Sequence, residues 1–166
     1  TFECWEIALK SENTPSAIAL SRQKVPYINP NNSKENKCEK GAYEVNLTSH
    51  ESNVTLVASG TEVELALKVQ DKLKENNIHS KVVSMPCMEL FDKQPEDYRK
   101  DILEENSLII TLEAGSVMSW QKYIKNKGAN LGIDKFGESA PYKEVYKHFK
   151  LSEEDITNFI QKKLRE

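Results

Sequence analysis

The sequence predicts an α/β protein, a three-layer α/β/α sandwich around a mainly parallel, mixed sheet of about five strands. Residues 54–58 (VTLVA) and 108–112 (LIITL) are runs of apolar residues, which are typical of strands buried on both faces. Amphipathic helical patterns separate such runs, so strands and helices alternate along the chain. Of the 166 residues, 38% are hydrophobic, which is enough for one packed core.

The first half of this pattern begins with an edge strand predicted at 43–47 and a buried strand at 54–58. A turn at 59–60 follows, and Thr61-x-x-Glu64 matches a capping box that would open a helix. Asparagines at 76–77 predict a left-handed end for that helix.

The second half continues with a strand at 81–85 that Pro86 ends, and with a helix at 95–103. After the strand at 108–112, we expect a helix through Ile124 and a short strand at 130–133. Ser152-x-x-Asp155 predicts the start of a final helix. Its apolar face has helical spacing and consists of Ile156, Phe159, Ile160 and Leu164.

The N-terminal part has a different organisation. Apolar residues at 2–9 predict a helix, and 16–20 (SAIAL) predict a short buried strand. A lone helix and strand cannot bury their apolar faces, so we expect residues 1–28 to be the tail of a preceding domain. Residues 29–41, which begin with a polar, Asn-rich stretch, are the predicted linker, and residues 42–166 are the main domain.

Composition excludes several classes of function. Lys and Arg number 23 against 26 Asp and Glu, so the net charge of −3 argues against binding nucleic acid or an anionic membrane. No apolar stretch approaches the ~20 residues of a membrane helix. The start, TFECW, lacks an initiator Met and a targeting segment, so we expect a chain entered midway.

Cysteine and histidine usage predicts no metal site. Cys4, Cys38 and Cys87 are odd in number and share no metal-type spacing, which fits a reducing, cytoplasmic compartment. We expect Cys87 to be a small buried hydrophobe rather than a reactive thiol. The three histidines lie far apart and form no metal-binding motif.

Three segments leave the carboxyl ends of predicted strands, where ligands gather in such sheets: 59–62, 84–87 and 113–116. The first and third place Gly and hydroxyl residues at helix N-termini, where anions bind, but capping alone explains them. A lone Glu113 is more typical of a cap or ion pair than of a general acid or base. Arg22 follows the predicted strand 16–20, where bidentate phosphate recognition is feasible.

Read together, these segments resemble the C-terminal part of the transketolase family, over essentially the whole chain and in order. The matching motifs are L-S-R-Q-K-V-P at 20–26, K-G-A-Y at 40–43, A-S-G-T-E-V at 58–63, V-S-M-P-C-M-E-L-F-D-K-Q at 83–94, L-E-A-G-S at 112–116 and F-G-E-S-A-P at 136–141.

The resemblance implies transfer of a two-carbon ketol unit between phosphorylated sugars in the pentose phosphate pathway, with chemistry supplied by thiamine diphosphate. Arg22 matches the family's arginine that grips the substrate phosphate, and Ser21 and Gln23 would support it. The cofactor and its divalent metal, Mg or Ca, are held by segments of other domains. We therefore expect no catalytic, cofactor-binding or metal-binding residue here, and an inactive fragment.

By the same resemblance, the partners are the remaining transketolase domains and a second copy in a homodimer. We expect Gly60, Thr61, Glu113 and Ser116 to be structural, with a regulatory pocket as the alternative. Two related enzymes share the domain type, the β-type subunit of 2-oxoacid dehydrogenases and deoxyxylulose-phosphate synthase, but the motifs at 83–94 and 136–141 argue against both. An independent α/β binding or dimerisation module would hardly begin with the orphan helix and strand of residues 1–28.

Overall fold

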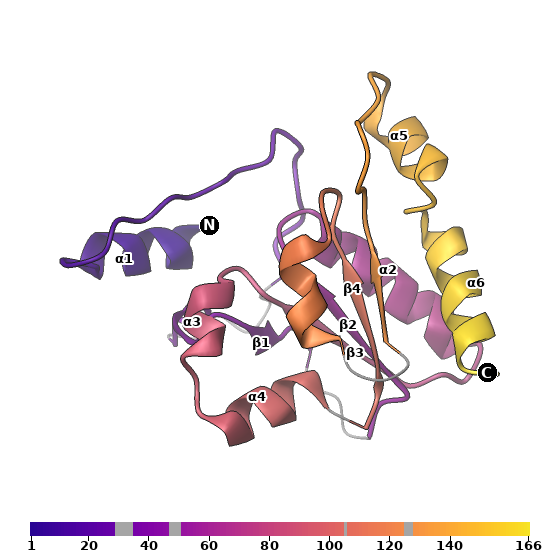
Figure 1. The fold of residues 1–166 in the computed structure, drawn as a ribbon, viewed down its shortest axis with the longest axis horizontal. Coiled ribbons are helices and arrows are strands. Elements are labelled where there is room, and N and C mark those ends of the chain that lie inside the picture. Colours follow the sequence, from indigo (N-terminus) through magenta and orange to yellow (C-terminus); the bar gives the residue numbers. More distant parts are fainter. Residues whose placement is uncertain (29–34, 47–50, 105, 125–127) are drawn as a thin grey trace.

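The computed structural model describes residues 1–28, 35–46, 51–104, 106–124 and 128–166, and it contains a five-stranded sheet. The strand order is β1-β3-β2-β4-β5; β1 runs antiparallel to β3, and all other neighbours are parallel. Figure 1 shows β2, β3 and β4 at the centre. The strands are β1 (Tyr43–Glu44), β2 (Val54–Ala58), β3 (Ser80–Ser84), β4 (Leu108–Leu112) and β5 (Ala129–Leu131).

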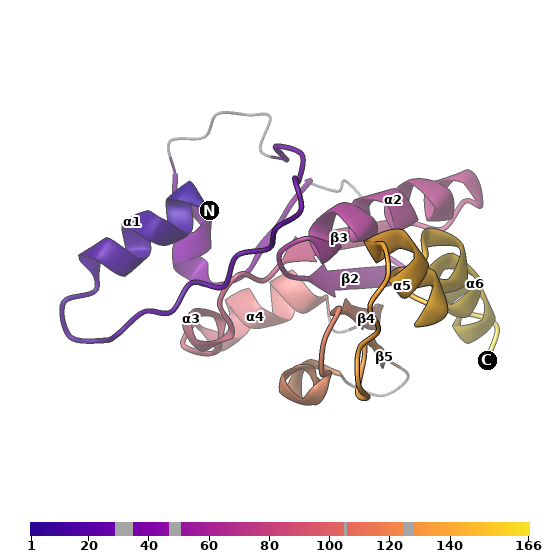
Figure 2. The ribbon, with the colours of Figure 1, turned by 90° about the horizontal axis from the view of Figure 1, so that it is seen from above.

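Helices cover both faces of this sheet, as Figure 2 shows, so the predicted three-layer sandwich is confirmed. On one face lie α2 (Glu62–Glu75) and α6 (Glu153–Lys163), with α5 (Tyr142–His148) beside them. On the other lie α3 (Met88–Asp92), α4 (Glu96–Leu103) and a 3-10 helix, η2 (Met118–Tyr123). Outside the sandwich are α1 (Phe2–Lys10) and the 3-10 helix η1 (Lys37–Lys40).

The strands are buried on both faces because their side chains alternate between two cores. Leu56 and Ile110 point toward α2 and α6, where they pack with Ile156 and other apolar residues. The opposite core is rich in aromatic side chains and contains Val57, Val83, Phe91, Ile109, Trp120 and Tyr123. Burial on both faces explains why the strand runs are apolar without alternation.

Helix α2 is confirmed, but the capping box predicted at its start is absent. Thr61 already has helical dihedral angles, so its hydroxyl does not cap the helix and instead donates to Glu62 Oε1 at 2.7 Å. Glu64 pairs with Lys68 at 2.8 Å rather than closing a capping box. The predicted left-handed end is confirmed at Asn77, with φ 57°.

The remaining elements follow the sequence pattern with three differences. The edge strand predicted at 43–47 is confirmed, but β1 has two residues, and residue 47 lies outside the described part of the chain. The helix predicted through Ile124 is the six-residue η2, and α5 was not predicted. The cap of α6 is confirmed, since the backbone N–H of Asp155 donates to Ser152 Oγ at 3.2 Å.

The N-terminal part confirms the predicted helix α1 but contradicts the strand predicted at 16–20. These residues form no regular structure and are mostly exposed. A strand needs a neighbouring strand to pair its backbone groups, and the described residues offer none beside this segment. Residues of α1 are all at least partly exposed, with Phe2 at 83% and Leu9 at 78%.

Helix α1 is held to the rest of the protein through the segment around η1. The Asn36 side-chain amide donates to the backbone oxygen of Glu3 at 2.9 Å and to Glu6 Oε2 at 2.8 Å. This contact brings Cys4 beside Cys38, and a hydrogen bond from the Cys38 thiol lowers the pKa of Cys4 to about 6.

No helix in the described ranges is long and apolar enough to cross a membrane.

The K-G-A-Y motif owes its glycine to a close approach between backbones. Gly41 has φ 78°, a left-handed conformation, and a Cβ there would lie 2.1 Å from the backbone nitrogen of Phe91 and 2.5 Å from the oxygen of Cys87. The carbonyl of Gly41 accepts a hydrogen bond from the N–H of Cys87 at 3.1 Å. This contact fixes the linker end against the start of α3.

We predict that Gly41→Ala lowers the free energy of unfolding by at least about 2 kcal/mol, because strain at positive φ adds to overpacking against backbone that cannot move aside. Urea unfolding followed by circular dichroism measures the change. Gly137→Ala is the matched control, since a Cβ at Gly137 meets nothing within 4 Å. Equal stability of the two variants would contradict the close approach.

Candidate functional site: a crevice at the carboxyl edge of the sheet

The topology creates a crevice outside the carboxyl ends of β2 and β4. From β2 the chain crosses through α2 to β3, and it then returns past β2 to β4 on the other side. Ala58 and Leu112, the last residues of β2 and β4, are register partners, so the loops after them start side by side. Ligands of open α/β sheets bind where the strand order reverses in this way.

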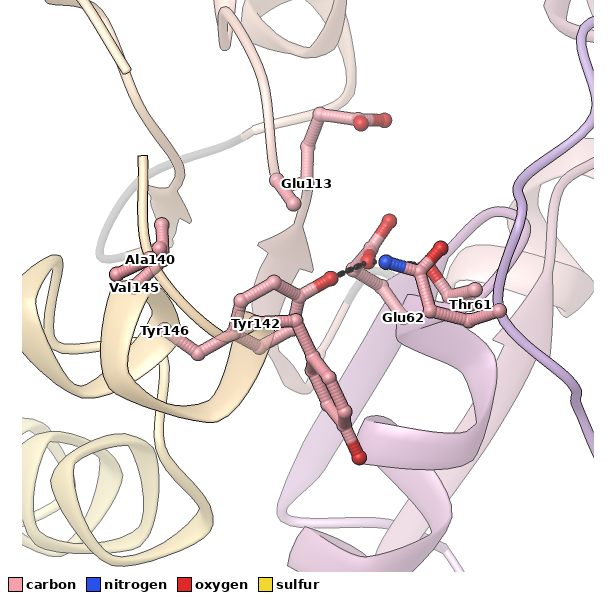
Figure 3. A pocket seen from close by; sticks show the side chains of 9 residues that line it. Thr61, Glu62, Glu113, Ala140, Tyr142, Val145 and Tyr146 are labelled. Atoms are coloured by element: carbon pink, nitrogen blue, oxygen red, sulfur yellow. Dashed lines mark hydrogen bonds between the residues drawn. The ribbon is translucent and has the colours of Figure 1, made fainter. Parts of the chain in front are cut away.

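A cavity of about 380 Å³ occupies this position, and we call it the carboxyl-edge crevice. Figure 3 shows that α2, the end of β4 and the segment around α5 all contribute to its wall. The lining residues are Gln23, Thr61, Glu62, Glu113, Ala114, Ala140, Tyr142, Val145 and Tyr146.

Glu62, in the first turn of α2, is the most buried charged group of the crevice, with 5% of its surface exposed. Its Oε1 accepts hydrogen bonds from the hydroxyl of Tyr146 and from that of Thr61 (Figure 3). No described residue donates to its Oε2. The carboxylate is therefore held in place by one oxygen, and the other is left for a further donor.

Glu113, directly after β4, is the second carboxylate. Its Oε2 accepts weak hydrogen bonds from Trp120 Nε1 at 3.3 Å and from Ser59 Oγ at 3.4 Å. Burial raises the pKa of Glu113, and the negative charge of Glu62 raises it further. Burial and the bond to Glu62 also raise the pKa of Tyr146, so this tyrosine is a hydrogen-bond donor at neutral pH.

The charge of the crevice limits what it can bind. Its ionisable lining consists of two carboxylates and two tyrosines, with no lysine, arginine or histidine. Phosphate and diphosphate groups would be repelled, so the crevice does not fit thiamine diphosphate. Within the described ranges, no group of three or more His, Cys, Asp or Glu residues is arranged to hold a metal ion.

Of the four residues named in the sequence at the ends of strands, Gly60, Thr61, Glu113 and Ser116, only two line the crevice. Thr61 and Glu113 meet at the crevice, as parallel strands ending at one edge predict. Gly60 is exposed, has a left-handed backbone conformation with φ 53°, and is not among the lining residues. Ser116 donates to Asp134 at 2.9 Å, which is a structural contact that holds the loop after β4 to the loop after β5.

Sequence reasoning missed the contribution of α5. Pro141 precedes Tyr142, Val145 and Tyr146, a helical i, i+3, i+4 spacing after a residue that favours helix starts. This signal is short, and it does not reveal that Tyr146 would bond to Glu62, 84 residues earlier in the chain.

Arg22 and Ser21 are exposed and belong to a segment without regular structure. Because residues 16–20 form no strand, the argument that Arg22 stands at a strand's carboxyl end is not supported, and its assignment rests on the resemblance alone. Within the described residues, neither side chain takes part in a hydrogen bond or ion pair. Their neighbour Gln23 lines the carboxyl-edge crevice.

The prediction that Cys87 is a small buried hydrophobe is confirmed only in part, because the side chain is partly exposed and its thiol donates to Glu89 Oε2 at 3.5 Å. Burial raises the pKa of this thiol, which fits an unreactive side chain. Cys4 and Cys38 lie side by side although 34 positions separate them in the sequence.

Comparison with known proteins decides the family. The model of the transketolase-like C-terminal domain matches residues 41–152, which is more than half of the chain. The chain belongs to the transketolase family. It is 40% identical over 162 residues to transketolase of Rhodobacter capsulatus, and this match covers 94% of the chain and 24% of the relative. It is 38% identical over 159 residues to chloroplastic transketolase of Zea mays, covering 94% of the chain and 23% of that protein.

Solved transketolases have the same fold. A transketolase of Pichia stipitis in complex with xylulose-5-phosphate superposes with a TM-score of 0.88 at 30% identity, over 98% of this chain and 23% of that one. The chain therefore spans about a quarter of the length of the transketolases it matches. Within this transketolase portion, the motifs at 58–63 and 112–116 supply the two carboxylates of the crevice.

The raised pKa of Glu113 predicts a specific pH dependence of stability. A carboxyl group whose folded pKa lies above its unfolded value, near 4.3, stabilises the fold below that value and loses this contribution as the pH rises through the folded pKa. Glu113→Gln stays neutral, so its stability relative to the unaltered chain should increase between pH 4 and pH 8. Urea unfolding across this range tests it.

The matched control is Glu12→Gln, which removes an exposed carboxylate outside the crevice. The increase for Glu113→Gln should exceed any change seen in this control. A flat profile for Glu113→Gln would contradict the unfavourable burial of its carboxylate.

Proposed function

We propose that this chain is the C-terminal portion of a transketolase that transfers two-carbon ketol units between phosphorylated sugars in the pentose phosphate pathway. The observation that carries the proposal is the match to transketolases over 94% of the chain, at 40% identity, together with a family model for residues 41–152. Relatives solved with xylulose-5-phosphate and sedoheptulose-7-phosphate support sugar phosphates as the substrate class.

The domain division we propose has three parts. Residues 1–28 are the tail of the pyrimidine-binding domain, 29–41 are the linker, and 42–166 are the C-terminal domain. The exposed apolar side chains of the first part support this division, because a helix with Phe2 and Leu9 in water needs a covering surface. We assign that surface to the remaining transketolase domains, within a cytoplasmic homodimer.

In this proposal the chain contributes substrate binding and assembly. The guanidinium of Arg22 binds the phosphate of the sugar, with Ser21 beside it, and this contact aligns a substrate whose reacting carbon lies elsewhere. Its exposure and the absence of a partner among the described residues leave the guanidinium available for a phosphate.

Thiamine diphosphate and its divalent metal, Mg or Ca, supply the carbanion chemistry in the family. We assign their binding to the other domains, since the carboxylate-lined crevice repels a diphosphate. An independent α/β binding module and the related thiamine-diphosphate enzymes are the alternatives, and the family match at residues 41–152 favours neither.

We predict that the 166-residue chain gives no heat of binding with thiamine diphosphate and Mg²⁺ in isothermal titration calorimetry, because the groups that hold them lie in other domains. A longer transketolase chain carrying those domains is the positive control. Binding by the short chain at micromolar concentration would contradict this division of labour.

We predict that Arg22→Ala in the longer transketolase chain raises KM for phosphorylated sugars about tenfold to a hundredfold, since a charge-assisted bidentate contact contributes roughly 1.5–3 kcal/mol. Steady-state kinetics with a phosphorylated and an unphosphorylated ketose measure the effect. Lys24→Ala is the matched control, because it removes an exposed cation two positions away. An equal rise in KM for both ketoses would contradict the assignment of Arg22 to phosphate binding.

A further inference from the structure

The carboxyl-edge crevice has a charge imbalance that the proposed function does not use. Two carboxylates, Glu62 and Glu113, face one cavity, and no ion pair among the described residues includes either of them. A buried carboxylate is costly unless a cation or several hydrogen-bond donors compensate it. Glu62, 95% buried, has donors on one oxygen only. Among the described residues, no lysine, arginine or histidine lines the cavity to compensate these charges.

Four separate motifs converge on this crevice. Thr61 and Glu62 come from the motif at 58–63, Glu113 from that at 112–116, and Ala140 from that at 136–141, while Gln23 belongs to the motif at 20–26. Packing alone does not need polar groups from three distant segments, around Gln23, Glu62 and Glu113, at one open cavity. Their convergence at the point where the strand order reverses indicates a binding site.

The walls of the crevice select the kind of ligand. The rings of Tyr142 and Tyr146 lie 5.9 Å apart in an edge-to-face arrangement, and Val145 and Ala140 add apolar surface (Figure 3). Carboxylates and tyrosine rings together favour an organic cation, since the ring faces attract positive charge and the carboxylates accept its N–H donors. A bare metal ion would find too few oxygen or nitrogen ligands.

We propose that the carboxyl-edge crevice binds a small organic ammonium ion, whose N–H groups donate to Glu62 Oε2 and to Glu113 and whose carbon chain packs against Tyr142 and Val145. A cavity of about 380 Å³ has the size of a small-molecule site. The hydroxyls of Tyr146 and Thr61 hold Glu62 in its binding orientation before the ligand arrives. The site adjoins the segment of the proposed sugar-phosphate contact, since Gln23, the sequence neighbour of Arg22, is one of its lining residues.

Calorimetric titration of the 166-residue chain with 1,4-diaminobutane tests the proposal. We expect saturable binding that weakens at least tenfold in Glu113→Gln and in Glu62→Gln, and no binding of the neutral analogue 1,4-butanediol. Glu12→Gln, the exposed control, should bind as the unaltered chain does. Absence of binding, equal binding of the diol, or equal weakening in the control would overturn the proposal.

Glu62→Gln alters a buried group, so Tyr142→Ala provides a second variant at a half-exposed position. We expect it to weaken diamine binding at least threefold while the far-ultraviolet circular dichroism and the urea midpoint of unfolding stay unchanged. Unchanged affinity in both Tyr142→Ala and Glu113→Gln would overturn the site.

A longer transketolase chain separates a ligand site from a contact between domains. If a lysine or arginine of another domain fills the crevice, 1,4-diaminobutane will bind the short chain but not the longer one, and this result would overturn the proposal. Binding to both chains supports it. The kinetics of Arg22→Ala are independent of either result, so failure of this inference is distinguishable from failure of the proposed function.

Discussion

The parallel pairing of β2 with β4 is the constraint on which the rest of the structure depends. Five register pairs, from Val54 with Leu108 to Ala58 with Leu112, place the two strands side by side and end them at the same level. Both strands are buried on both faces, so a one-residue shift would move every side chain into the wrong core. This register also places Glu62 and Glu113 at one cavity, although they are far apart in the sequence.

The electrostatics of the crevice follow from that pairing. The first residue of α2, Glu62, and the residue after β4, Glu113, each place a carboxylate at the carboxyl edge. Burial and the repulsion between the two carboxylates raise the pKa of Glu113. The fold tolerates this cost because Tyr146 and Thr61 donate to Glu62. Such an unfavourable arrangement in an open cavity is more typical of binding sites than of packing contacts.

The N-terminal residues leave several large apolar side chains exposed. Helix α1 contacts the segment around η1 through Asn36, yet its apolar side chains stay largely in water. The chain spans about a quarter of the length of its relatives, and we propose that the remaining transketolase domains cover these side chains. The carboxyl-edge crevice, by contrast, is built almost entirely from the main domain, with Gln23 as the one lining residue from the N-terminal part.

The sequence by itself determined the buried strands and the longer helices, because apolar runs and helical periodicity are local patterns, and its motifs indicated the family. It predicted a strand at 16–20 and a side-chain cap on α2 that the structure lacks, and it did not predict the helix α5, because strand pairing and backbone dihedral angles outweigh composition there. Only the tertiary structure brought Glu62, Glu113 and Tyr146 together and placed Cys4 beside Cys38. Contacts across tens of residues depend on strand order and register, which no local pattern in the sequence contains.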